Sequence, residues 1–202
     1  TKMRIGMQAG DGEGLIDEVA LFNSALSASD ITSIYNSGAP GDITSLNPVG
    51  WWRMGDNDGG TGTTITDQGS GGNNGTLVNG PTFSTDVPPL PAWNGNSYAL
   101  SFDGSDDFVN VDGVATEIAS MTNFSCSAWI KKGTEGTFPI IFRAASSNSV
   151  HIGMFEYNNN LVISCISGGF SEAVDTGGVN IADDQWHHVM MTYEKTGTNT
   201  ST

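Results

Sequence analysis

The stretch GLIDEVALFNSALSASDITSIYNSG, residues 14–38, decides the fold of this chain. Its first half, residues 15–22, alternates in a manner that predicts a strand with two distinct faces. The alternation places Ile16, Glu18, Ala20 and Phe22 on one face and Leu15, Asp17, Val19 and Leu21 on the other. A strand, a turn and a short helix form the pattern of a domain's closing elements, although they stand here near the beginning of the chain.

The second half of the stretch predicts one short helix near residues 28–36. Ser27 can cap this helix, and Asp30 at the third helical position completes a weak capping box. Apolar residues at helical spacing, among them Ile34 and Tyr35, form a stripe on one side. Gly38 suits the left-handed conformation that ends many helices.

The rest of the chain consists of short runs typical of strands, separated by turns. Strands are predicted at residues 3–8, 50–55, 75–80, 123–133, 138–146, 149–158, 160–168 and 186–195, and residues 97–113 are predicted to form a strand, a tight polar turn and a second strand. Many short strands with turn signals every 8–12 residues are typical of sandwiches and jelly rolls. The sequence therefore predicts an all-β fold, an antiparallel two-sheet jelly-roll sandwich.

The composition limits the class of partner. The chain has 202 residues, of which 37% are hydrophobic, and 22 acidic residues oppose seven Lys and Arg for a formal net charge of −15. Because phosphate backbones and anionic membrane surfaces attract basic patches, we expect no nucleic acid partner and no binding to an anionic membrane surface. No run approaches the roughly 18 apolar residues that span a membrane, so we also expect no membrane insertion. The acidity fits either solubility in a salty or extracellular medium or divalent-cation binding by clustered carboxylates.

Five motifs follow one another between residues 50 and 195, in the order GWWRMGD, GSGGNNGTL, YALSFDGSDDFVNV, NFSCSAWIK and DDQWHHVMMTYEK. This ordered set resembles the laminin-G-like, concanavalin A-like lectin/glucanase jelly-roll domains. The resemblance covers almost the whole chain, because GLIDEVALFNSALSASDITSIYNSG is similar to the last strand and short helix of the same family. It implies a concanavalin A-like sandwich.

The order of the segments departs from the family, since the family's C-terminal segment is placed first. We expect residues 1–38 to be the closing strand and helix of a jelly roll, residues 39–49 a linker, and residues 50–202 the first and larger part of a jelly roll. Two arrangements stay open. Residues 1–38 complete the same sandwich in cis, or they belong to a tandem or neighbouring copy, with strands exchanged at open sheet edges.

The sequence indicates a protein that is not an enzyme. Glycoside hydrolases need two carboxylates that flank the scissile bond, and no motif here has the spacing of such a pair. The adjacent Asp17 and Glu18 are expected to point to opposite faces of a strand, so they cannot both reach one bond. No Ser or Cys stands in a nucleophile motif.

The turn FDGSDDFV, residues 102–109, carries Asp103, Asp106 and Asp107. Calcium binds several oxygens that a tight turn can deliver together, but Asp and Gly are also ordinary turn formers. The resemblance implies that this turn lies near the closing strand, where related domains often hold a structural calcium. The predicted metal ligands are Asp103, Asp106 and Asp17, with calcium as a structural cofactor.

Exposed aromatic rings are the usual platforms for sugars. Four tryptophans fall in predicted strands and are interpreted as core residues, namely Trp51, Trp52, Trp129 and Trp186. Trp93 and Tyr157 fall in loops and are the predicted ligand-binding residues. Cys126 and Cys165 are interpreted as small core residues, and a disulfide between them stays open.

We predict a non-catalytic adhesion or glycan-binding module of a larger, repetitive protein, located outside the cell or on a virion or cell surface. Its partner would be a glycan or a cell-surface polysaccharide. One alternative is a structural fibre or coat subunit that self-associates head-to-tail through its sheet edges. Another is an accessory domain of a glycoside hydrolase.

Overall fold

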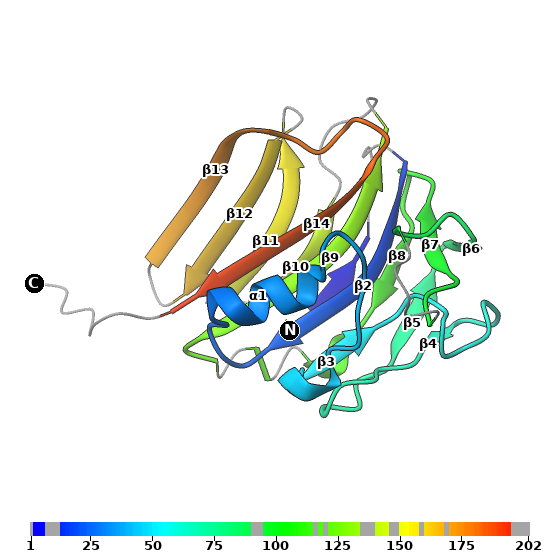
Figure 1. Ribbon diagram of the computed structural model, residues 1–202, viewed down its shortest axis with the longest axis horizontal. Helices are drawn as coiled ribbons and strands as arrows, with labels where there is room; N and C mark the ends of the chain where they lie inside the picture. Colours follow the sequence, from blue (N-terminus) through cyan, green and yellow to red (C-terminus); the bar gives the residue numbers. More distant parts are fainter. Residues whose placement is uncertain are drawn as a thin grey trace, which may run out of the picture.

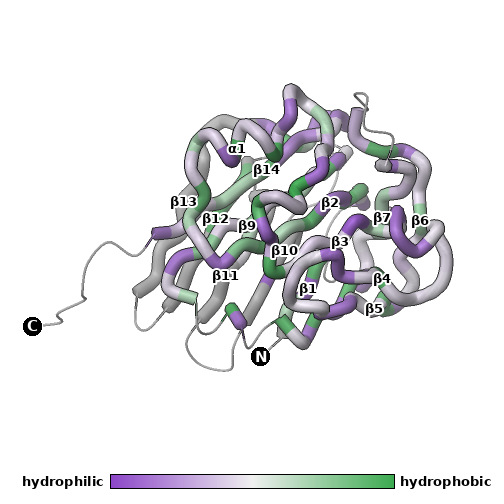
Figure 2. The backbone as a smooth tube through the Cα atoms, turned by 60° about the horizontal axis from the view of Figure 1, so that its bottom comes forward, coloured by the Kyte–Doolittle hydropathy of each residue, from purple (hydrophilic) through white to green (hydrophobic). Residues whose placement is uncertain are grey.

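Two antiparallel β-sheets face each other and enclose a hydrophobic core (Figure 1). The computed structural model describes residues 2–6, 13–89, 95–114, 117–118, 121–133, 140–145, 150–157, 160–167 and 170–194. Side chains buried between the sheets include Met3, Ile5, Leu100 and Phe102. In Figure 2 many hydrophobic positions lie on strands of the two sheets, while the connecting loops are largely hydrophilic or neutral.

The larger sheet has eight strands in the order β13-β12-β11-β10-β1-β8-β5-β4. These strands are β1 (Lys2–Ile5), β4 (Thr64–Ile65), β5 (Gly75–Val78), β8 (Phe108–Asn110), β10 (Ile140–Ala145), β11 (Val150–Tyr157), β12 (Asn160–Ser167) and β13 (Phe170–Asn180). The smaller sheet has the order β14-β9-β2-β7-β6, and β3 pairs with β2 beside it. Its strands are β2 (Gly14–Phe22), β3 (Gly50–Trp52), β6 (Thr82–Ser84), β7 (Ala99–Phe102), β9 (Phe124–Lys132) and β14 (Trp186–Tyr193).

Every strand pair in the two sheets is antiparallel. The described residues also include the helix α1 (Ala28–Tyr35) and two 3-10 turns at Thr44–Leu46 and Asp112–Val114. The prediction of an all-β, two-sheet antiparallel sandwich with a short helix near residues 28–36 is confirmed. No helix among the described residues is long and apolar enough to cross a membrane.

The beginning of the chain supplies an interior strand to each sheet. β1 pairs with β10 on one side and with β8 on the other. β2 pairs with β9 on one side and with β7 and β3 on the other. Both sheets of the single chain are therefore built around strands from its first 22 residues.

Helix α1 lies across the outer face of the smaller sheet (Figure 1). Its capping box is formed as predicted, because the Ser27 side chain accepts from the backbone of Asp30 and the Asp30 side chain accepts from the backbone of Ser27. Ile34 is buried in an outer cluster with Ala20, Phe22, Ile43 and Trp51. The left-handed cap is Asn36, at φ 43°, two residues before Gly38.

The predicted regular alternation of β2 is wrong after Asp17. The register against β9 shifts between Asp17 and Ala20, and Glu18 has the positive φ of 48°. Ile16 and Val19 both belong to the core between the sheets, so one extra residue is accommodated between them as a bulge. Asp17 and Glu18 consequently lie on the same, outer side, and the expectation that they point to opposite faces is also wrong.

Strand β13 lies where no strand was predicted. It pairs with β12 along most of its length, at one edge of the larger sheet. Its sequence, FSEAVDTGGVN, is rich in glycine and polar residues, which have low strand propensity. Backbone pairing with β12 overrides that propensity.

Of the two cysteines, Cys126 is buried in the core, and the side chain of Cys165 lies outside the described residues.

Candidate functional site

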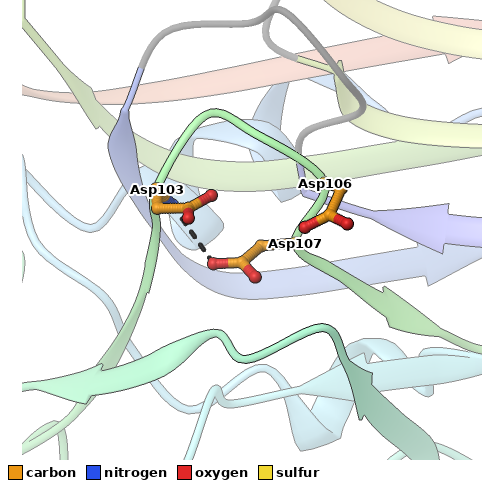
Figure 3. Close-up of side chains that lie close together, drawn as sticks. All are labelled: Asp103, Asp106 and Asp107. Carbon is orange, nitrogen blue, oxygen red and sulfur yellow. Dashed lines mark hydrogen bonds between the residues drawn. The ribbon is translucent and has the colours of Figure 1, made fainter.

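The acidic turn between β7 and β8 brings Asp103, Asp106 and Asp107 together (Figure 3). One carboxylate oxygen of each lies within 4.8 Å of the others. The backbone N–H of Asp103 donates to Asp107 Oδ2 at 3.2 Å, and that of Ser105 donates to Asp103 Oδ1 at 2.8 Å. Asp103 and Asp106 are exposed and Asp107 is buried, so burial raises the pKa of the Asp107 carboxyl. Three clustered carboxylates can hold a metal ion.

The third predicted ligand, Asp17, is not a member of this acidic turn. Phe102, which precedes the turn, pairs with Gly14 of β2. Asp17 is three residues further along β2, a distance of roughly 10 Å along a strand. The structure brings together Asp103 and Asp106, adds Asp107 to them, and places Asp17 in different surroundings.

Asp17 belongs to a buried ionic centre, which consists of Asp17, Glu18, Arg53, Asp56 and Asn96. Arg53 Nε lies 3.0 Å from Glu18 Oε1, and Arg53 Nη2 lies 2.9 Å from Asp56 Oδ2. The second oxygen of Glu18 accepts from the Trp51 indole, and Asp56 Oδ1 accepts from the backbone N–H groups of residues 97 and 98. The centre therefore joins β2, the segment after β3 and the segment before β7.

Two members of the buried ionic centre are incompletely bonded. Asp17 is completely buried, and its Oδ1 accepts from the Glu18 backbone at 2.8 Å, but its Oδ2 has no hydrogen-bond partner among the described residues. Asn96 is 3% exposed, and within the described part of the chain neither Oδ1 nor Nδ2 has a partner. The Asn96 side chain nevertheless lies close enough to lower the pKa of Asp17 as a hydrogen-bond donor, so the two polar groups face each other in a contact that falls short of good hydrogen-bond geometry.

The carboxyls of this centre have raised pKa values because they are buried close together. Burial raises the pKa of Asp17 well above its usual value, and the charges of Glu18 and Asp56 raise it further. Burial raises the pKa of Glu18 to about 7, against the opposing effect of Arg53. Burial also raises the pKa of Asp56. These carboxyls therefore bind protons more readily than carboxyls in water do.

The donor atoms of the buried ionic centre fit the calcium that the resemblance implies. Calcium prefers carboxylate and amide oxygens, and Asp17 and Asn96 offer both kinds in a buried position. An oxygen without a partner in such a position is what a bound cation would satisfy. The acidic turn offers only carboxylates, two of them exposed to water, which can solvate them without a metal.

A polar groove is lined by the segments that follow β2, precede β3, connect β4 with β5 and precede β9. Its cavity volume is about 460 Å³, and its lining residues are Asn23, Val49, Ser70, Gly71, Glu117, Met121 and Thr122. Amide, hydroxyl and carboxylate groups converge there, as in sites that hydrogen-bond sugar hydroxyls. The sequence analysis missed this groove because its residues come from four separate segments with no shared motif.

The predicted aromatic ligand residues are not tested by the structure. Trp93 and the side chain of Tyr157 lie outside the described residues, although Tyr157 is the last residue of β11. The core interpretation is right for Trp51, Trp52 and Trp129, which are buried, whereas Trp186 is half-buried. Tyr35 is the large hydrophobic side chain that the described surface exposes, and its ring stacks on Trp129 with centroids 6.2 Å apart.

Residues 103–201 match the family model of the concanavalin A-like lectin/glucanases superfamily, in its laminin-G type. The match begins at the acidic turn and extends past β14. Neither the curated proteins nor the solved structures that were compared give a match to the chain.

Proposed function

We propose a glycan-binding or adhesion role for this chain, from the premise that it carries a laminin-G-like domain of the concanavalin A-like lectin/glucanases superfamily. This superfamily match on a two-sheet sandwich is the observation that carries the proposal. Carbohydrate binding and adhesion are the general roles of such domains, which are typically extracellular and generally non-catalytic. The finer proposal is a non-catalytic module on a cell or virion surface, within a larger protein.

The polar groove is the proposed glycan site among the described residues. Its volume is in the range of small-ligand sites, and Asn23, Ser70 and Thr122 supply donors and acceptors for sugar hydroxyls. The chain's net charge of −15 repels polyanions, so we propose a neutral glycan or polysaccharide. Trp93 and Tyr157 stay proposed as additional aromatic contacts.

Changing the residues that line the groove should weaken glycan binding. Asn23 and Thr122 are exposed, so Asn23→Ala and Thr122→Trp should fold, the first losing amide contacts and the second occupying the cavity. The measurement is a screen of neutral oligosaccharides on an array, followed by titration calorimetry with each hit. We expect at least tenfold weaker binding for both variants. Thr82→Ala, an exposed change on β6, is the matched control and should bind as the unchanged chain does.

Two other results would count against this assignment. Binding that survives Thr122→Trp would place the glycan elsewhere on the domain. Hydrolysis of any bound oligosaccharide over a long incubation would contradict the proposal that the chain is not an enzyme.

Calcium is part of the proposal as a structural cofactor. The oxygen donors of the acidic turn and of the buried ionic centre support it. The predicted ligands Asp103, Asp106 and Asp17 fall into these two places, and removal of calcium should destabilise the fold.

A second candidate function is head-to-tail assembly by strand exchange, as in a fibre or coat subunit. The edge position of β14 favours it, because an edge strand presents unpaired backbone groups to another chain. Figure 1 shows β12 and β13 of the larger sheet extending beyond β14. Assembly of this kind would make the oligomeric state depend on protein concentration.

A further inference from the structure

The polar groove has one charged side chain, Glu117, among the described residues that line it. Asn23, Ser70 and Thr122 line the groove with uncharged polar groups, whereas Glu117 supplies a carboxylate. No Lys or Arg is among these described lining residues, in a chain whose formal net charge is −15. A ligand that enters the groove therefore meets a negative potential, which attracts a positively charged group.

The neighbouring Asn73 fixes the Glu117 carboxylate in place. Asn73 Nδ2 donates to Glu117 Oε1 at 3.1 Å. The backbone N–H of Asn73 donates to Asp67 Oδ2 at 2.7 Å, and its carbonyl accepts from the indole of Trp52 at 2.9 Å. Trp52 is itself completely buried in the core. Asn73 is thus a rigid support, and a carboxylate held in this way loses little freedom when a ligand binds.

The absence of a side chain at Gly71 leaves space in front of Glu117 Oε1. A Cβ atom added at residue 71 would lie 3.3 Å from Glu117 Oε1 and 2.7 Å from Asn73 Nδ2. Gly71 is exposed and lines the groove. The space that another side chain would fill is therefore available to a ligand, beside a carboxylate that can accept about four hydrogen bonds.

We propose that the groove binds a glycan unit that carries a protonated primary amine, and that Glu117 Oε1 accepts a hydrogen bond from this amine. The amine occupies the space in front of Gly71, while hydroxyl groups of the glycan bond Asn23 and Thr122. A hydrogen bond between two charged groups is roughly twice as strong as one between neutral groups. The chemical class of the bound unit is therefore an amino sugar, within a glycan that is otherwise uncharged.

This inference rests on the glycan site of the proposed function and names the chemistry of one bound unit. The net charge of −15, which disfavours a polyanion, favours a unit of positive charge. Val49 and Met121 give the groove an apolar side, against which the carbon face of a sugar ring can pack. Glu117 consequently determines specificity, whereas Asn73 is a positioning residue.

The test compares two trisaccharides that differ by one charge. One is the trimer of N-acetylglucosamine, and the other is the same trimer with one acetyl group removed, which leaves a primary amine. Titration calorimetry with the full chain should show that the amine trimer binds roughly ten- to a hundredfold more tightly. Glu117→Gln is nearly isosteric and removes the charge, so it should bind the two trimers equally and keep the affinity of the unchanged chain for the acetylated trimer.

The charge-matched control is Glu13→Gln. Glu13 is exposed and precedes β2, whereas Asn23 follows β2, so a nine-residue strand of roughly 30 Å separates Glu13 from the groove. This variant should keep the full preference for the amine trimer. Thr122→Lys is an exposed change that adds a cation to the groove. It should weaken binding of the amine trimer at least tenfold and that of the acetylated trimer less, which guards against misfolding of Glu117→Gln.

Three results would overturn the inference. If the unchanged chain binds both trimers equally and Thr122→Trp weakens both, the groove is a glycan site but its preference for an amine fails. If Glu117→Gln and Glu13→Gln reduce the preference equally, the amine responds to the net charge of the chain and not to Glu117. If neither trimer binds, the inference fails, and the array of neutral oligosaccharides decides the proposed function separately.

Discussion

Burial lowers the pKa of His188 to about 4. The imidazole packs against the stacked rings of Trp129 and Tyr35, with centroid distances of 5.2 and 6.1 Å, and its Nε2 has no partner among the described residues. An unfolded chain takes up this proton near pH 6.5, whereas the folded protein resists it until about pH 4. The free energy of unfolding should therefore fall by up to about 3 kcal/mol as the pH drops through this range.

The measurement is urea-induced unfolding of the full chain at pH 7 and pH 4. His188→Gln cannot take up the proton, so its unfolding free energy should fall less than that of the unchanged chain. Thr192→Ala, an exposed change on the same strand, controls for effects of mutation on β14. An equal fall for His188→Gln and the unchanged chain would show that the burial of His188 does not govern acid stability.

The buried ionic centre contains side-chain contacts that the sequence did not predict. Asp17 was predicted as a metal ligand, and its neighbour Glu18 was expected on the opposite face of the strand. The bulge reverses the second expectation, because alternation of side chains holds only while the pairing register is regular. Asn96 and Arg53 were not predicted as partners of Asp17 and Glu18, since they come from separate segments and carry no motif. Only the fold brings these four residues together.

Helix α1 is the element whose sequence signals were most complete. Its capping box satisfies backbone donors at the first turn, with Ser27 N donating to Asp30 Oδ2 at 3.0 Å. Ser27→Ala should therefore cost about 1 kcal/mol. Ser33 lies in the exposed part of the same helix, so Ser33→Ala should leave stability unchanged or slightly raised, because alanine has the higher helix propensity.

Calorimetric melting separates these two variants. We expect Ser27→Ala to melt roughly 2–4 °C below the unchanged chain. Equal melting of Ser27→Ala and Ser33→Ala would mean that α1 is held by the burial of Ile34 alone and that its cap contributes nothing.

Other elements show why patterns predict some strands and not others. The apolar β9 and β14 were predicted within one or two residues, since burial requires alternating apolar side chains. The polar, glycine-rich β13 was missed, because a strand at a sheet edge can be held by backbone pairing alone. The left-handed stop of α1 was assigned to Gly38, whereas the cap that follows the last helical residue is Asn36, two residues earlier.

At the scale of the whole molecule, the beginning of the chain is part of the middle of both sheets. Residues 1–38, which were predicted to be closing elements, supply two interior strands, β1 in the larger sheet and β2 in the smaller. β2 also carries Ile16, Val19 and Leu21 into the core between the sheets and Ala20 and Phe22 into the outer cluster. An interior strand with two buried faces can be removed only at a large cost in buried apolar area.

We therefore propose that residues 1–38 complete the sandwich in cis, and light scattering over a concentration series tests it. The full chain should be a monomer at every concentration, with and without calcium. A chain of residues 46–202 should aggregate or remain unfolded, because both sheets would lose an interior strand. A synthetic peptide of residues 1–38, added to that shorter chain, should restore a folded one-to-one complex.

If the full chain instead forms oligomers that grow with concentration, β1 and β2 pair with a neighbouring copy, and strand exchange becomes the leading function. If residues 46–202 fold alone, these strands are dispensable, and the segment order has another explanation.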